Sequence, residues 1–265
     1  MLCGDDQPGL RFYTARQGRV RRGVLSYAEE MRAQEKVIVE AFRVLADSLR
    51  PDYGIVDILD RLVAACVDTT PGIAGGVVVA DGSGILHVAA SSSERTTDVE
   101  EAQLGAAAGP CLDCFASGQL VAVDHLPAAA DKWPQFVDLA LREGFGSAYA
   151  VPLKAAGTTL GSVNLFVGHE GGMQQDDLDL AGALTEVAAI NIIQRERAAG
   201  HVATAEQLQR ALDSRVIIEQ AKGVIAQQRG IGIDAAFGLL RGHARNHGLR
   251  IHDVAWIVVE RHLEI

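Results

Sequence analysis

The chain has 265 residues, of which 48% are hydrophobic, so it has enough apolar material for one large or two ordinary domains and is not wholly disordered. No apolar run approaches the roughly 20 residues that a membrane span needs, and the first 23 residues lack the apolar stretch of a signal peptide. We therefore expect a cytoplasmic protein. Four cysteines at irregular spacing suit a reducing compartment and predict neither a disulfide framework nor a metal site.

The net charge of −10 is unevenly distributed along the chain. Residues 205–265 contain 8 Lys and Arg against 7 Asp and Glu, a balance of +1, so residues 1–204 carry −11. A polyanion as a whole repels nucleic acid, but this asymmetry permits a nucleic-acid contact in the C-terminal quarter.

The N-terminal residues 1–26 mix Gly, Arg and Gln without a period, which predicts a disordered tail or a basic arm. Helical patterns then cover residues 27–49, where Pro51 ends the helix, and about residues 54–67.

Two short apolar runs, residues 77–80 and 85–88, flank the sequence Asp81-Gly82-Ser83-Gly84, which is typical of a hairpin turn. A polar loop is expected next. Gly109-Pro110 then precedes a helix over residues 111–117, because proline suits the first helical position.

Residues 120–123 are a short predicted strand, and Trp133-Pro134 leads into a helix that ends near Gly144. Apolar and polar residues alternate over residues 148–154 and 162–167, which predicts a second hairpin with one face on the core.

A long helix over about residues 175–197 ends this part of the chain, and Ala198-Ala199-Gly200 marks a boundary after it. Strands joined by hairpins imply an antiparallel sheet, here flanked by helices. The predicted fold class is therefore α+β over residues 27–198.

Residues 204–265 predict an all-α domain of three helices, over residues 206–229, 234–246 and about 252–263. The connections between them are short, so the helices should fold back on one another as a small bundle. Asp234 is the expected N-cap of the second helix.

Cations border the apolar faces of the first two helices of this bundle. Arg215, Lys222 and Arg229 are seven residues apart and line one edge, while Arg241 and Arg245 are four apart beside the second helix's core face. Arginine binds phosphate through its planar fork and stacks on bases. Such cations are also found as solvated charges whose stems cover a core, and the spacing alone leaves both interpretations open.

Three runs in this segment resemble the ANTAR domain family: residues 214–223 (Ser-Arg-Val-Ile-Ile-Glu-Gln-Ala-Lys-Gly), residues 235–245, and Asp253-Val254-Ala255. The resemblance implies a three-helix module that binds paired RNA stem-loops, typically as a homodimer, and prevents terminator formation. Gly238 and Gly242 depart from the larger residues usual in the family. The RNA-contact candidates carried over by motif position are Arg215, Gln220, Ala221, Lys222, Gly223, Arg241, Ala244 and Arg245.

The order of elements before the boundary is similar to that of a GAF domain, a fold that binds cyclic nucleotides, tetrapyrroles and other small ligands. Residues 109–112, 133–136, 147–153 and 161–165 carry the resemblance, which covers about residues 35–195. It implies sensing of a small molecule whose identity the sequence does not give, so cofactors are unknown.

Cys111 and Cys114 stand at the start of a predicted helix, where a thiol with a lowered pKa can act as a redox switch. The same two residues also suit a ligand pocket, or simply the core, as small apolar side chains.

Together these features predict a transcription antiterminator controlled by a GAF-like sensor; the alternative is a DNA-binding regulator with a small-molecule or redox sensor. No motif pairs a nucleophile with a base, so we expect no enzymatic activity. We expect a homodimer, with Leu184, Ile192, Leu208 and Leu212 as candidates for its seam.

Overall fold

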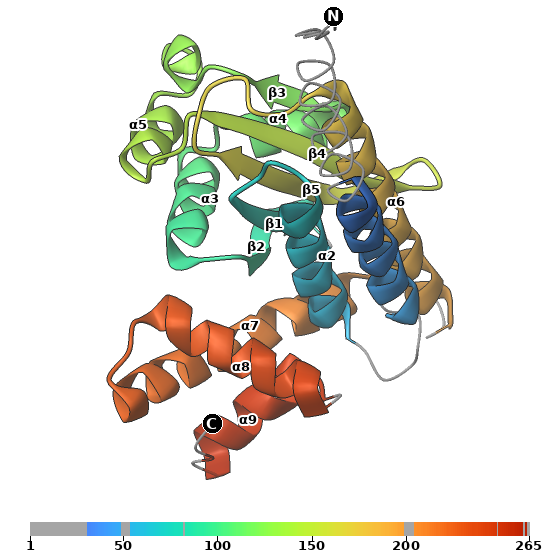
Figure 1. The fold of residues 1–265 in the computed structure, drawn as a ribbon, viewed down its shortest axis with the longest axis vertical. Helices are drawn as coiled ribbons and strands as arrows, with labels where there is room; N and C mark the ends of the chain where they lie inside the picture. Colours follow the sequence, from blue (N-terminus) through green and yellow to red (C-terminus); the bar gives the residue numbers. More distant parts are fainter. Residues whose placement is uncertain are drawn as a thin grey trace, which may run out of the picture. The chain divides into compact units, whose positions relative to one another are not determined.

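A five-stranded antiparallel sheet, in the order β2-β1-β5-β4-β3, forms the centre of the computed structural model (Figure 1). The structure describes residues 31–48, 54–81, 83–198, 204–247, 249–261 and 263. The predicted tail over residues 1–26 lies outside the described residues, as do the last two residues of the predicted boundary at 198–200.

Two hairpins build most of the sheet, as the sequence predicts. The first joins β1 (Ala74–Ala80) to β2 (Leu86–Ser91), and the second joins β4 (Ser147–Ala155) to β5 (Thr158–Val167). β1 also pairs with β5, and the three-residue strand β3 (Val121–Val123) forms the edge beside β4.

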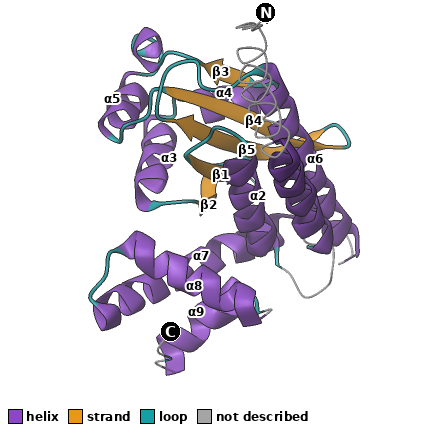
Figure 2. Cartoon of the chain, in the orientation of Figure 1, coloured by secondary structure: helices purple, strands orange, loops and turns teal. Residues whose placement is uncertain are grey.

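Helices cover both faces of the sheet (Figure 2). α2 (Ile55–Thr69) and α6 (Gln175–Ala198) pack on one face, and α3 (Glu94–Ala106), α4 (Pro110–Ser117) and α5 (Pro134–Arg142) pack on the other. Both faces of β4 and β5 are buried, because each face meets a layer of helices and not solvent. Polar and apolar side chains therefore alternate only weakly along these strands. The α+β class is confirmed.

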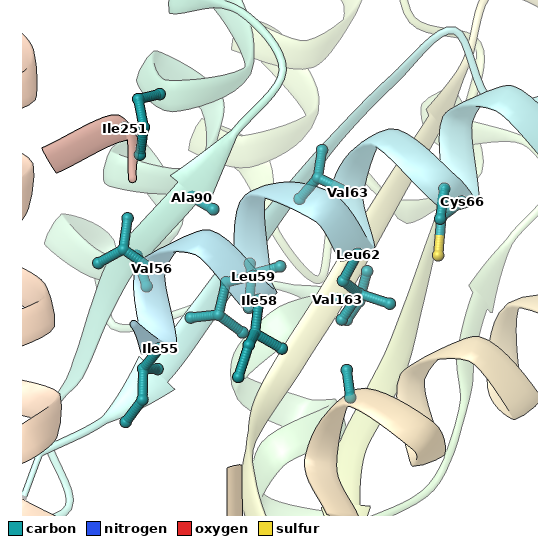
Figure 3. Packing of buried hydrophobic residues seen from close by; sticks show 14 of the residues in the cluster. Ile55, Val56, Ile58, Leu59, Leu62, Val63, Cys66, Ala90, Val163 and Ile251 are labelled. Carbon is teal, nitrogen blue, oxygen red and sulfur yellow. The ribbon is translucent and has the colours of Figure 1, made fainter. Parts of the chain in front are cut away.

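Successive side chains of β1 point to opposite faces of the sheet and so pack in different helical layers. Val77 and Val79 join the core under α2 and α6, whereas Val78 packs with Cys111 of α4 on the opposite face. Figure 3 shows Leu62 of α2 beside Val163 of β5 in the first of these cores.

The segment expected to be a polar loop after β2 is helix α3, so that expectation is wrong. Ser93 caps this helix by accepting a hydrogen bond from the backbone N–H of Thr96. Its buried face carries the polar residues Glu100 and Gln103 next to Val99. A helix that buries polar side chains shows no apolar stripe, and the sequence pattern therefore missed it.

Three helices form the C-terminal bundle: α7 (Thr204–Arg229), α8 (Ile233–His247) and α9 (Ile251–Arg261). Gly230 adopts a left-handed conformation with φ 64° directly after α7, which lets the chain turn back into α8. The predicted all-α bundle and its three helices are confirmed to within a few residues at each end. Its core side chains are Ile218, Ala221, Ile225, Ala236, Leu240, Ala244, Val254, Ala255 and Val258.

Residues 31–47 are helical, as predicted. By its contacts the chain divides into the units Met1–Glu40 and Ala41–Ile265. In the second unit the end of this helix is fixed to α6, because Asn191 Nδ2 donates hydrogen bonds to the carbonyl of Leu45 (2.9 Å) and to Ser48 Oγ (3.2 Å).

α6 and α7 have 24 and 26 residues, yet no helix in the described part of the chain is apolar enough to cross a lipid bilayer. Leu184 and Ile192 of α6 are buried in the core of the sheet domain, with 0% and 1% exposed. Both are therefore unavailable for a dimer seam, which corrects that expectation. The side chains of Leu208 and Leu212 lie outside the described residues.

The two-residue turn between β4 and β5 yields a stability prediction. Ala156 and Gly157 both have positive φ, at 52° and 81°, which a hairpin turn of this length requires. A left-handed alanine costs about 1–2 kcal/mol, and glycine avoids most of that cost. We expect Ala156→Gly to raise the free energy of unfolding in urea by about 0.5–1 kcal/mol, after allowance for the extra entropy of glycine in the unfolded chain.

The matched control is Ala155→Gly, one residue earlier and buried in β4. This change should lower stability, because it removes a packed methyl group without relieving strain. Equal losses of stability in both variants would contradict the strained turn.

Candidate nucleic-acid interface

Two of the predicted cations meet at one aromatic ring between α7 and α8. Lys222 Nζ lies 5.0 Å from the centroid of the Phe237 ring, and the guanidinium carbon of Arg241 lies 4.3 Å from it. Cations over an aromatic face are attracted by its negative quadrupole. Helices α7 and α8 therefore bring Lys222 and Arg241 together, an arrangement that their spacing allowed but did not decide.

Lys222 is buried. Its place in a row of cations along one edge of the helix did not indicate this. Its side chain is 4% exposed, and its ammonium group pairs with Glu94 Oε1 of α3 and with Glu219 Oε2 at 2.7 Å. A buried ammonium requires such partners because an isolated charge is costly to remove from water.

Arg241 pairs with Asp60 of α2, at 3.7 Å between Arg241 Nη1 and Asp60 Oδ1. Burial raises the pKa of Asp60, and the guanidinium of Arg241 opposes that rise. Within the described residues, Asp60 Oδ1 has no hydrogen-bond partner. The contact is thus an ion pair without a hydrogen bond, and its geometry is loose.

The other candidates fall into three groups. Gln220 and Gly223 are exposed on α7, and a Cβ added at Gly223 would meet open space, so both are accessible to a ligand. Ala221 and Ala244 are 0% and 4% exposed in the bundle core, so their methyl groups cannot contact RNA in this conformation. The prediction that these two residues contact RNA is therefore wrong. The side chains of the remaining two lie outside the described residues; these are Arg215 and Arg245.

Backbone groups at two helix N-termini complete the contact between the sheet domain and the bundle. Asp57 Oδ1 accepts the N–H of Ile251 at 3.1 Å, while Asp57 Oδ2 accepts that of Gly54 at 2.7 Å, so one carboxylate serves the starts of both α9 and α2. Burial raises the pKa of Asp57, against these two hydrogen bonds. In return, Asp234 Oδ1 accepts the N–H of Glu94 at 2.9 Å.

The role expected of Asp234, capping its own helix, is therefore corrected: its carboxylate satisfies the first N–H of α3 instead. Sequence reasoning also missed Asp57, Asp60 and Glu94 as partners of the bundle. Nothing local to these residues marks them, because their partners lie more than a hundred residues away along the chain.

A second polar cluster is buried inside the sheet domain. Glu100 Oε2 accepts hydrogen bonds from Asn164 Nδ2 at 2.8 Å and from Gln103 Nε2 at 3.1 Å. Its other oxygen, Oε1, is buried without a partner in the described part of the chain. Burial raises the pKa of Glu100 to about 8, although the hydrogen bond from Asn164 opposes the rise. Glu100 is therefore largely protonated at pH 7.

Cys111 and Cys114 are free and fully buried at the start of α4. Burial raises the pKa of both thiols, that of Cys114 to about 12. This is opposite to the lowered pKa that the redox interpretation requires, and that interpretation is corrected. The described residues also contain no cluster of three His, Cys, Asp or Glu side chains that would hold a metal ion.

The described residues thus form an antiparallel sheet domain followed by a helical module in which two cations meet at one aromatic ring. The family model of the GAF domain matches residues 54–192, and that of the ANTAR domain matches residues 206–259. The chain belongs to the GAF domain family and carries an ANTAR domain after it. It is a regulator with a sensor domain. No curated protein matches the chain.

Several solved structures are similar to the GAF part. The GAF domain of a phosphoenolpyruvate-protein phosphotransferase from Coxiella burnetii is 14% identical with a TM-score of 0.49, and the match covers 64% of this chain and 97% of that one. Free methionine-R-sulfoxide reductase from Neisseria meningitidis is 18% identical with a TM-score of 0.48, covering 62% and 91%. An Acinetobacter GAF domain is 11% identical with a TM-score of 0.47, covering 62% and 98%.

Glu100 predicts how stability depends on pH. Its pKa rises from 4.5, the ordinary value for a glutamate side chain, to about 8 in the folded protein, so between these pH values unfolding releases a proton. Raising the pH from 5 to 8 therefore favours the unfolded state, and the loss ends above pH 8. We expect Glu100→Gln to flatten this fall in the free energy of unfolding, measured by urea denaturation at pH 5, 6, 7 and 8.

Asp98→Asn is the control, because Asp98 is exposed on the same helix. It should leave the pH profile of the wild type unchanged. A Glu100→Gln profile as steep as that of the wild type would show that Glu100 does not titrate in this range.

Proposed function

We propose that the protein is a signal-responsive RNA-binding regulator that binds paired stem-loops in nascent transcripts and acts as a transcription antiterminator. The GAF domain senses a small molecule and controls the ANTAR domain, which contacts the RNA as part of a homodimer. The proposal includes a cytoplasmic location, as the sequence predicts.

The convergence of Lys222 and Arg241 on Phe237, inside the ANTAR match, is the observation that carries the proposal. Two cations that lie at one ring suit the phosphates of a folded RNA, whose loops bring several backbone groups together. Gln220 is exposed on the same helix as Lys222 and offers both a donor and an acceptor to a base edge.

Sensing is assigned to the GAF domain because its core holds an unpaired polar atom. Glu100 Oε2 already accepts two hydrogen bonds, so the proton of the neutral acid belongs on Oε1, which has no partner among the described residues. We propose that a small ligand with a hydrogen-bond acceptor completes this group. We also propose that the protein acts by binding and not by catalysis; the raised pKa of its buried thiols supports this view.

Arg245→Ala tests RNA binding, because position 245 lies on α8, four residues after Arg241, and falls within the ANTAR motif. We expect affinity for RNA with two stem-loops to fall roughly tenfold, and the slope of log K against log salt to flatten by about one, as loss of one phosphate contact requires. Fluorescence anisotropy of the intact protein at several salt concentrations measures both quantities.

Arg142→Ala, which removes an exposed arginine from α5 of the GAF domain, is the charge-matched control and should bind as the wild type does. A duplex DNA of the same sequence serves as the competitor. Tighter binding to the duplex, or equal salt slopes for all three proteins, would contradict the proposed RNA contact.

A further inference from the structure

We propose that the contact between the GAF domain and the ANTAR domain is autoinhibitory: the carboxylates of Glu94 and Asp60 occupy Lys222 and Arg241, the cations that RNA phosphates would bind. This inference rests on the proposed function, because it concerns regulation of the same RNA-binding surface. The two cations are covered by α2 and the start of α3 of the same chain.

Lys222 cannot serve RNA and the GAF domain at once. Its ammonium group already contacts the carboxylates of Glu94 and Glu219 and faces the Phe237 ring, and its side chain is only 4% exposed. A phosphate has no route to this group while Glu94 stays in place. Arg241, 30% exposed and paired with Asp60, is similarly engaged. Carboxylates and phosphates compete for the same donors because both are anions that accept hydrogen bonds from Lys and Arg.

The contact combines polar pairs with buried apolar side chains. Besides the two ion pairs it uses one hydrogen bond at each of two helix starts, from Ile251 to Asp57 and from Glu94 to Asp234. Val56 and Ala90 of the GAF domain also belong to the same buried apolar cluster as Ile218 and Phe237 of the ANTAR domain. Water and RNA can replace the polar partners, so RNA competes for this polar part of the contact.

A small cavity lies between the two domains and weakens their packing further. It measures about 20 Å³, enough for one water molecule, and is lined by Val56, Asp60 and Ala90 of the GAF domain and by Ile218 and Phe237 of the ANTAR domain, among others. Asp60 Oδ1 faces Arg241 at 3.7 Å but accepts no hydrogen bond in the described part of the chain, which adds the cost of a buried acceptor. Both features lower the free energy that is needed to open the contact.

Helix α3 joins the inhibitory contact to the buried cluster of the GAF domain. Glu94 is its first residue, and Glu100 lies six residues, or roughly 9 Å, further along the same helix. A ligand that repositions Glu100 moves Glu94 with it, because a helix transmits displacement along its axis. The signal thus reaches Lys222 through one rigid element.

The test compares three intact chains: the wild type, Glu94→Gln with Asp60→Asn, and a control with Asp131→Asn and Asp176→Asn. The control removes two exposed carboxylates elsewhere in the GAF domain, so both variants gain the same net charge. The probe is a synthetic RNA pool of paired stem-loops with randomised loops, and filter binding gives the affinity. We expect the first variant to bind on the order of tenfold more tightly than both the wild type and the control, a typical coupling between sites.

Two further variants show whether a gain in affinity comes from the freed cations. Glu94→Gln alone changes a side chain that is 38% exposed, so it should fold even if Asp60→Asn does not, and should bind RNA more tightly than the wild type. Lys222→Ala added to the released variant should reduce the gain, because one of the two freed cations is then missing. Circular dichroism verifies that each chain is folded.

The possible outcomes distinguish autoinhibition from RNA binding itself. Equal affinity of the folded variants and the wild type overturns autoinhibition and leaves RNA binding standing. A gain in the control as large as that in the released variant also overturns it, since general charge then explains the effect. No RNA binding by any chain, the released variant included, overturns the proposed function and the inference with it.

Discussion

The burial of one ammonium group, that of Lys222, constrains much of the contact between the two domains. A charge that is 4% exposed is tolerated only where carboxylates surround it, and Glu94 and Glu219 supply them from α3 and α7. Phe237 closes the remaining side with its ring. Three helices from two domains are thereby held at one point. The position of α3 in the GAF domain and that of α7 in the ANTAR domain are linked by this requirement.

The uneven charge of the chain has a structural counterpart in this contact. Residues 1–204 carry a net charge of −11, and part of that charge, at Asp57, Asp60 and Glu94, faces the bundle. Asp57 and Glu94 also stand in the first turns of α2 and α3, where the helix dipole favours negative charge. Glu94 therefore stabilises its own helix and pairs with Lys222 of the bundle, while Asp57 stabilises α2 and accepts the N–H of Ile251.

Glu100 gives the GAF domain a different kind of polar group. It is neutral at pH 7 because burial raises its pKa to about 8, and it lies on the side of α3 that packs on the sheet. One helix thus carries a partly exposed glutamate at its start, in contact with the bundle, and a fully buried one in the core. Burial, which disfavours the charged form, is the cause of the raised pKa of Glu100.

The sequence by itself determined the class of fold, both hairpins and the three C-terminal helices. Each of these follows from local periodicity, turn residues or motif spacing, which act over a few residues. It failed at α3, whose buried face is polar, and at Ala221 and Ala244, whose small side chains fit a core as readily as a surface. Only the tertiary structure decided that Lys222 is buried and that Asp57, Asp60 and Glu94 face the bundle. Those pairings join residues far apart in the chain, and electrostatic partners carry no mark in their own neighbourhood of the sequence.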